Sequence, residues 1–345
     1  MSENDEQDCC CGGLLTSNDV RTAIISGDTF KNKTVQYAAV DGMAVFEGCI
    51  VLGKVDDVEA RTAEAKAALD AGDDPEGVSH GVVVTGQDKR WPNATMPYEI
   101  DPGLPSVNVQ RVNDAIAHWE ANTPINFVQR TSANASQYPN YVYFKPATGC
   151  WSYVGMQGGR QDIGLATGCG FGATVHEIGH AAGLWHEQSR EDRDSKIAIQ
   201  WQNIQAGKEH NFNQHISDGD DVGAYDYGSI MHYGRFAFSK NGQPTIETIP
   251  AGQSIGQRSG LSAGDIAAIN SIYQAWDTVT LSRVYCSHGS KNCWVMPAGS
   301  GWRRIDPKSE DGVENIFDQC CFAVAFGKQV SLYMDGQTVY RAQLL

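Results

Sequence analysis

The 345-residue sequence predicts an α+β protein organised in three sections. Residues 1–80 carry one helical pattern and end in an acidic, glycine-bearing run. Residues 81–277 alternate strand-like runs with helical patterns, and residues 278–345 hold short β-like runs between glycine-rich turns. We therefore expect a mostly irregular first section, a larger α+β domain and a small β-rich C-terminal domain.

Helices are expected where apolar or small side chains recur at helical spacing. One such pattern covers residues 55–69 and a second covers 109–119, while a third is suggested around 262–273. The stretch 71–81 between the first two sections reads as an exposed linker, because it combines acidic residues with glycines. The expected strands lie at 98–100, 125–128, 141–144 and 163–166 in the second section and at 278–285, 322–326, 330–334 and 338–341 in the third.

Composition and charge argue against several functional classes. The formal net charge is −15, and the acidic excess lies mainly in the first section, so a nucleic-acid partner is not expected. No apolar run approaches about 18 residues, so no membrane span is expected. The acidic N-terminus lacks the basic start and apolar run of a secretory signal, which leaves export by another route and retention in the cell both open.

The run His-Glu-Ile-Gly-His-Ala-Ala-Gly-Leu-Trp-His at 176–186 is the most informative part of the sequence. On a helix, His176 and His180 lie one turn apart on the same face, so both can bind a single Zn²⁺. Gly183 permits the positive φ that ends the helix and brings His186 in as a third ligand. Three protein ligands leave a position open for water, as catalytic zinc requires. Glu177 would then point at that water and act as catalytic base. The alternative, a helix whose histidines merely fill surface or core positions, does not explain the joint spacing.

This motif and its surroundings resemble the astacin family, within the metzincin clan of zinc peptidases. The family's extended motif HExxHxxGxxHExxRxDRD continues without a break from His186 to Asp194. Matrixins would have Ser after the third histidine and serralysins usually Pro, so Glu187 favours astacins over the rival metzincins. The resemblance covers roughly residues 85–275 and includes similar stretches at 149–155, 199–204, 225–233 and 261–273.

The resemblance implies a two-lobed zinc endopeptidase that acts on protein or peptide substrates. It implies that Tyr233 is a fourth zinc ligand in the resting mature enzyme and donates a hydrogen bond to the oxyanion during the reaction. The alternative for Tyr233 is a buried core tyrosine. Met231 would form the Met-turn, a packing floor beneath the metal. Cys150 and Cys169 fit one of the two disulfides of many astacins, and both partners of the other are missing. A disulfide favours an oxidising compartment, and we expect a secreted or exported protein rather than a cytoplasmic one.

The resemblance also implies that residues 1–80 are a propeptide and that the chain is a zymogen. Astacin propeptides block the zinc with the aspartate of an F-x-G-D motif, and this chain has Phe-Glu-Gly-Cys at 46–49. A thiolate binds zinc well, so Cys49 is expected to block the metal, as in the cysteine switch of matrixins. The alternative is a buried structural cysteine. Activation is expected to cut within 77–86 and to bring the new N-terminus to Glu187.

Two questions stay open at this stage. A rival function is that of an inactive, protease-like binding module, which the joint presence of Glu177, the three histidines and Tyr233 disfavours. The C-terminal domain, 278–345, has no ligand that its sequence identifies. Its four cysteines allow three pairings if all are bridged: Cys286, Cys293, Cys320 and Cys321.

Overall fold

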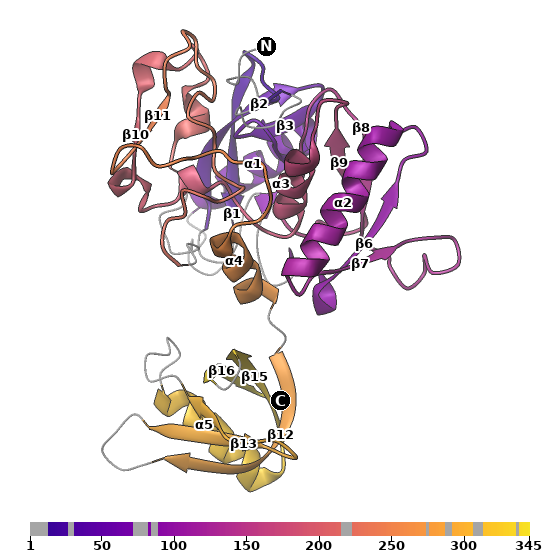
Figure 1. Ribbon diagram of the computed structural model, residues 1–345, viewed down its shortest axis with the longest axis vertical. Helices are drawn as coiled ribbons and strands as arrows, with labels where there is room; N and C mark the ends of the chain where they lie inside the picture. The colour runs from indigo at the N-terminus through magenta and orange to yellow at the C-terminus, as the bar shows by residue number, and fades with distance from the viewer. Residues whose placement is uncertain are drawn as a thin grey trace. The chain divides into compact units, whose positions relative to one another are not determined.

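A computed structural model describes residues 13–26, 31–71, 82–83, 89–214, 223–273, 276–286, 292–305, 313–335 and 338–345 (Figure 1). The chain separates into two compact units, residues 1–272 and 273–345. The predicted propeptide and the predicted peptidase section therefore belong to one unit. Cys9 to Cys11 and most of the predicted cleavage window lie outside the described residues. Among the described residues, no helix is both long enough and apolar enough to cross a membrane.

The N-terminal section forms a five-stranded sheet in the order β4-β3-β2-β1-β5. Strands β1 to β4 are antiparallel neighbours, whereas β5 runs parallel to β1. The helix α1 follows β4 directly and buries Val55, Val58, Thr62 and Ala65 on one face, while Leu69 on the same face is half-buried. The bounds are β1 Val20–Ser26, β2 Lys33–Val40, β3 Met43–Phe46, β4 Ile50–Lys54, α1 Val55–Asp70 and β5 Val82–Val83.

The expectation of a mostly irregular propeptide is wrong. Its strands carry apolar side chains that are buried in a core shared with the rest of the unit. Tyr37, Phe46 and Ile50 are almost fully buried in that core, and Val154 and Trp185 of the following section pack against the same cluster. Packing between distant segments, which local periodicity does not reveal, therefore stabilises these strands.

The second section contains a four-stranded parallel sheet in the order β7-β6-β8-β9. Helices α2 and α3 lie side by side, and the indole N–H of Trp119 on α2 donates to the carbonyl of Val175 on α3 over 3.2 Å (Figure 1). The expected strands and the helix that holds Trp119 are confirmed within a few residues. The bounds are β6 Thr95–Ile100, α2 Ser106–Asn122, β7 Asn126–Gln129, β8 Tyr141–Pro146, β9 Arg160–Leu165 and α3 Phe171–Ala181.

Beyond α3 the chain consists mainly of short turns around a second core. Side chains far apart in sequence meet in this core, among them Ile197, Phe212 and Tyr233. The predicted helix around 262–273 is confirmed as α4, Ala263–Tyr273. The other elements of this part are η3 Glu187–Ser189, η4 Arg193–Ser195, β10 Ile197–Ile199, η5 Trp201–Asn203, η6 Glu209–Phe212 and β11 Ile246–Thr248, and η2 Pro92–Ala94 precedes β6.

The C-terminal unit is a closed barrel in the order β12-β13-β14-β16-β15, with one helix against it. The expected strand at 322–326 is wrong, because these residues end the helix α5. Val313, Ile316, Cys320 and Ala323 are buried at helical spacing, which a short apolar run does not reveal. Cys286 and Cys293 form a disulfide. The bounds are β12 Trp276–Cys286, β13 Cys293–Pro297, β14 Arg303–Ile305, α5 Val313–Phe326, β15 Gln329–Asp335 and β16 Thr338–Leu344.

Candidate metal centre

The helix α3 carries His176, Glu177 and His180 and is buried along most of its length. Two glycines let it approach its neighbours closely. A Cβ on Gly172 would lie 1.8 Å from the carbonyl oxygen of Arg258, and one on Gly179 would lie 2.8 Å from the sulfur of Met231. The helix is therefore packed closely against residues that follow it in the sequence, and the Met231 sulfur lies against Gly179, the residue before His180.

The chain leaves α3 through Gly183, whose φ is +108°. Side chains other than hydrogen are strained at this φ, so glycine permits the abrupt end of the helix. Leu184 N–H then donates back to the carbonyl of Gly179 over 2.9 Å. His186 follows in extended backbone, with its ring next to those of the two helical histidines.

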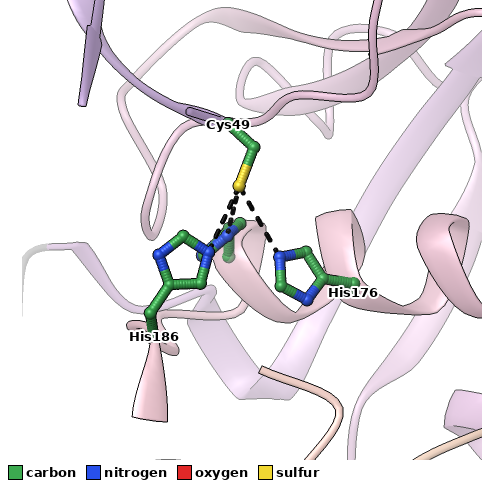
Figure 2. A group of neighbouring side chains, drawn as sticks. Cys49, His176 and His186 are labelled. Carbon is green, nitrogen blue, oxygen red and sulfur yellow. Dashed lines mark hydrogen bonds between the residues drawn. The ribbon is translucent and has the colours of Figure 1, made fainter. Parts of the chain in front are cut away.

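The structure brings the three histidines together with Cys49. The Cys49 sulfur lies 3.6, 3.4 and 3.2 Å from the Nε2 atoms of His176, His180 and His186, and all four side chains are buried (Figure 2). The four ligand atoms lie within 4.8 Å of one another. A tetrahedral zinc ion with ordinary bond lengths separates sulfur from nitrogen by about 3.6 Å. The donor set and its spacing therefore fit one zinc ion.

Hydrogen bonds to the Nδ1 atoms, which point away from the cluster, fix the orientation of the three rings. His176 Nδ1 donates to the carbonyl of Ile230, and His180 Nδ1 donates to the carbonyl of Leu184, both over 2.8 Å. A carbonyl can only accept, so Nδ1 carries the proton in both rings and the lone pair on Nε2 faces the cluster. His186 Nδ1 has a different partner, the carboxylate of Glu47 at 2.6 Å.

Burial keeps these rings neutral. Removal from water lowers the pKa of His176 and of His180 well below the usual value, and the same effect lowers the pKa of His186 to about 3. The positive charge of Arg258 lowers all three pKa values further. Neutral imidazole is the form that binds metal ions, so the site is ready for a metal at physiological pH.

Cys49 reaches the histidines from a tight turn between β3 and β4. Glu47 and Gly48 both have positive φ, 46° and 73°, and reverse the chain after Phe46. The chain after the turn then pairs with the main chain of Ser152 in the second section. Ser152 N–H donates to the carbonyl of Cys49 over 3.0 Å, and Val51 N–H donates to the carbonyl of Ser152 over 2.8 Å. Main-chain pairing therefore determines where the sulfur points.

Tyr233 lies beside the cluster, with its ring 4.9 Å from that of His186 between centroids. It is fully buried, and its hydroxyl donates to the main-chain carbonyl of Glu47 over 2.6 Å. The predicted role of this hydroxyl as a zinc ligand concerns the form without the propeptide. In this structure the hydroxyl is hydrogen-bonded to the N-terminal section.

The two glutamates of the extended motif have different surroundings. Glu177 is fully buried on α3, directly after His176. Glu187 accepts a hydrogen bond from the N–H of Asp226 over 2.6 Å and lies 3.5 Å from Arg190. Burial raises the pKa of Glu187 to about 8, despite these two contacts. The structure does not contain the new N-terminus with which Glu187 is expected to pair.

Cys150 and Cys169 form the expected disulfide, immediately before the Trp151–Ser152 edge. Glu47 was not among the site residues predicted from the sequence. Glu47 occupies the variable second position of the F-x-G-D motif, so the motif assigns it no role. The available signal was a carboxylate two residues before Cys49, the expected metal ligand.

Comparison with known proteins gives a consistent result. The family model for the astacin peptidases matches residues 83–274. Among curated proteins, Blastula protease 10 of Paracentrotus lividus is 41% identical over 241 residues, which is 67% of this chain and 39% of that protein. Human meprin A subunit beta is 34% identical over 250 residues, or 69% of this chain and 34% of that protein. The chain therefore spans about two fifths or less of these two relatives.

Among solved structures, high choriolytic enzyme 1, a hatching enzyme zinc-protease from Oryzias latipes, is 38% identical. The match covers 54% of this chain and 92% of that one, with a TM-score of 0.49.

Proposed function

The chain belongs to the astacin family, and from this premise we propose that it is a zinc-dependent endopeptidase kept latent by its own N-terminal section. One observation carries the proposal: three neutral histidine nitrogens and the sulfur of Cys49 converge at the spacing that tetrahedral zinc requires. Three of these ligands come from the family motif, and the fourth comes from residues 1–80.

When bound, a zinc ion would supply Lewis acidity, which polarises a peptide carbonyl and lowers the pKa of water toward about 7. His176, His180 and His186 would hold the ion. Glu177 would take the proton of the attacking water and pass it to the departing amine. Tyr233 would donate to the oxygen of the attacked carbonyl as negative charge develops on it. After release of the propeptide, the main chain of Ser152 would align the substrate backbone, because the propeptide pairs with the same N–H and carbonyl.

Latency would follow from the turn at residues 47–49. Cys49 takes the position that a catalytic zinc site leaves open, and its thiolate is a strong zinc ligand. The carbonyl of Cys49 and the N–H of Val51 occupy the main-chain N–H and carbonyl of Ser152, so a peptide cannot pair there. The carbonyl of Glu47 holds the Tyr233 hydroxyl. The turn would thus occupy the zinc position, the substrate edge and the oxyanion donor together.

Activation would require a cut within residues 77–86 and release of the propeptide. Glu187 supports this step, because it is a buried carboxylate whose raised pKa shows that its surroundings disfavour its charge. A new ammonium group nearby would stabilise that charge. Two disulfides, Cys150–Cys169 and Cys286–Cys293, support a secreted or exported location. The substrates would be proteins or peptides, and the C-terminal unit has no assigned ligand.

Zinc content and caseinolytic activity, measured before and after limited proteolysis, test the proposal. We expect one zinc ion per chain in both forms, and activity only after a cut within 77–86 identified by N-terminal sequencing. A chelator should remove the activity, and added zinc should restore it. A cut, zinc-loaded chain that cleaves no protein or peptide would favour the binding-module alternative.

A further inference from the structure

Glu47 is a fully buried carboxylate. Its backbone φ is 46°, in the left-handed region that residues other than glycine seldom adopt. A buried charge is unfavourable unless polar groups surround it. Two polar groups of the section that follows the propeptide meet this need. Its Oε2 accepts from His186 Nδ1 at 2.6 Å, and its Oε1 accepts from the hydroxyl of Ser189.

The three zinc histidines differ in what holds their outer nitrogens. His176 and His180 donate to carbonyls of the peptidase section itself, those of Ile230 and Leu184. These two partners remain after activation. His186 donates to a side chain that leaves with the propeptide. A carboxylate on the outer nitrogen fixes the tautomer of a ligand histidine and raises its basicity more than a neutral carbonyl does.

We propose that Glu47 is a positioning residue of the zinc site, which the propeptide supplies only in the latent form. It holds the His186 ring in the tautomer and orientation that bind the metal, so the latent chain binds zinc more tightly than Cys49 alone would achieve. When the propeptide leaves, His186 loses this carboxylate at the same time as the metal loses the sulfur. The inference rests on the proposed function, since it assumes that zinc occupies this site.

The zinc dissociation constant of the uncut chain, measured by competition with a chelating indicator, tests the proposal. Glu47→Gln preserves length and shape but replaces the carboxylate with a weaker, neutral acceptor. Loss of such a partner typically weakens metal binding by about 10–100-fold, and we expect a change of that size. Glu64→Gln is the matched control, because Glu64 is exposed on α1 of the same propeptide. The zinc dissociation constant of this variant should equal that of the wild type.

Cobalt substitution shows whether the variant still docks its propeptide. The Glu47→Gln chain loaded with Co²⁺ should keep the thiolate-to-metal absorption of Cys49. Weaker zinc binding with that band intact confirms the proposal. An unchanged zinc dissociation constant overturns it, and so does weaker binding that occurs only together with loss of the band.

A measurement on the wild type covers the case in which Glu47→Gln does not fold. In ¹H–¹⁵N spectra of the zinc-loaded uncut chain, the Nδ1 proton of His186 should be strongly deshielded by its carboxylate partner, unlike those of His176 and His180. This signal should vanish after cleavage and propeptide removal. Three similar Nδ1 protons would overturn the proposal. A wild-type chain that binds no zinc, or that never becomes active, would instead refute the proposed function.

Discussion

The helix α3 and the turn at 47–49 both deliver ligand atoms to the same buried cluster, but they are built differently. The helix positions His176 and His180 by its regular spacing, and hydrogen bonds within the peptidase section fix both rings. The turn positions Cys49 through two residues with positive φ and through main-chain pairing to a distant edge. The hydrogen bonds that orient the helical histidines therefore lie within the second section, whereas the geometry of the turn depends on the surface against which it packs.

This difference suggests that the helix and the turn have separate roles, which mutations can distinguish. Changes on the helix side should affect catalysis once the chain is cut and should leave latency intact. Changes in the turn should affect latency and leave the cut enzyme unaltered.

The largest effect is expected at Glu177. In the cut chain, Glu177→Ala should lower kcat by about 10²–10⁴-fold, the usual contribution of a general base, while zinc content stays at one per chain. Peptide cleavage and metal analysis on the same sample check this expectation. Glu209→Ala, at an exposed position on η6, is the control and should behave as the wild type. Substantial residual turnover by pure Glu177→Ala would remove Glu177 from the role of base.

A smaller effect is expected at Tyr233, which interacts with both regions. Tyr233→Phe should lower kcat of the cut chain on the order of 10²-fold, because one oxyanion donor is lost. The uncut chain should lose its hydrogen bond to the Glu47 carbonyl but stay latent. Steady-state kinetics of the cut variant give the measurement, with Tyr227→Phe as the control. An unchanged kcat would leave Tyr233 as a core tyrosine.

Cys49→Ala should raise the activity of the uncut chain, but only in part. The turn would still hold Tyr233, and loss of that donor alone costs on the order of 10²-fold. We therefore expect the uncut variant to stay at least about 10²-fold less active than the cut enzyme. Assays on both forms check this, with Cys321→Ala in the C-terminal unit as the control. No rise at all in the uncut chain would contradict the switch role of Cys49.

The smallest effect is expected at Gly48, where a Cβ would lie 2.9 Å from Leu14 and 3.1 Å from Phe238. Gly48→Ala should lower the free energy of unfolding of the uncut chain by more than the roughly 1–2 kcal/mol of left-handed backbone strain. Gly42→Ala isolates the strain, because Gly42 has φ +79° and no atom within 4 Å of an added Cβ. Equal losses in urea unfolding would mean that the turn is not closely packed.

The zinc histidines were predictable because their chemistry and their helical period occur within eleven consecutive residues. Cys49 was predictable only through its place in a family motif. The N-terminal sheet was not predictable, because residues such as Tyr37 and Ile50 pack across segments that no local window contains. Glu47 was missed for a related reason. Its partner His186 lies 139 residues away, and only the folded chain brings the carboxylate to the ring.

The core shared by the N-terminal sheet and the peptidase section has a consequence for the time course of activation. Val154 and Trp185 pack into the same cluster as Phe46 and Ile50, so cutting the linker breaks one peptide bond but none of these contacts. The severed propeptide would remain as a tight, non-covalent inhibitor, and its departure would be a separate and slower event. Activity should then appear only after a lag. A second cut, within the propeptide, should shorten this lag more than dilution does. Excess free propeptide should inhibit the mature enzyme again.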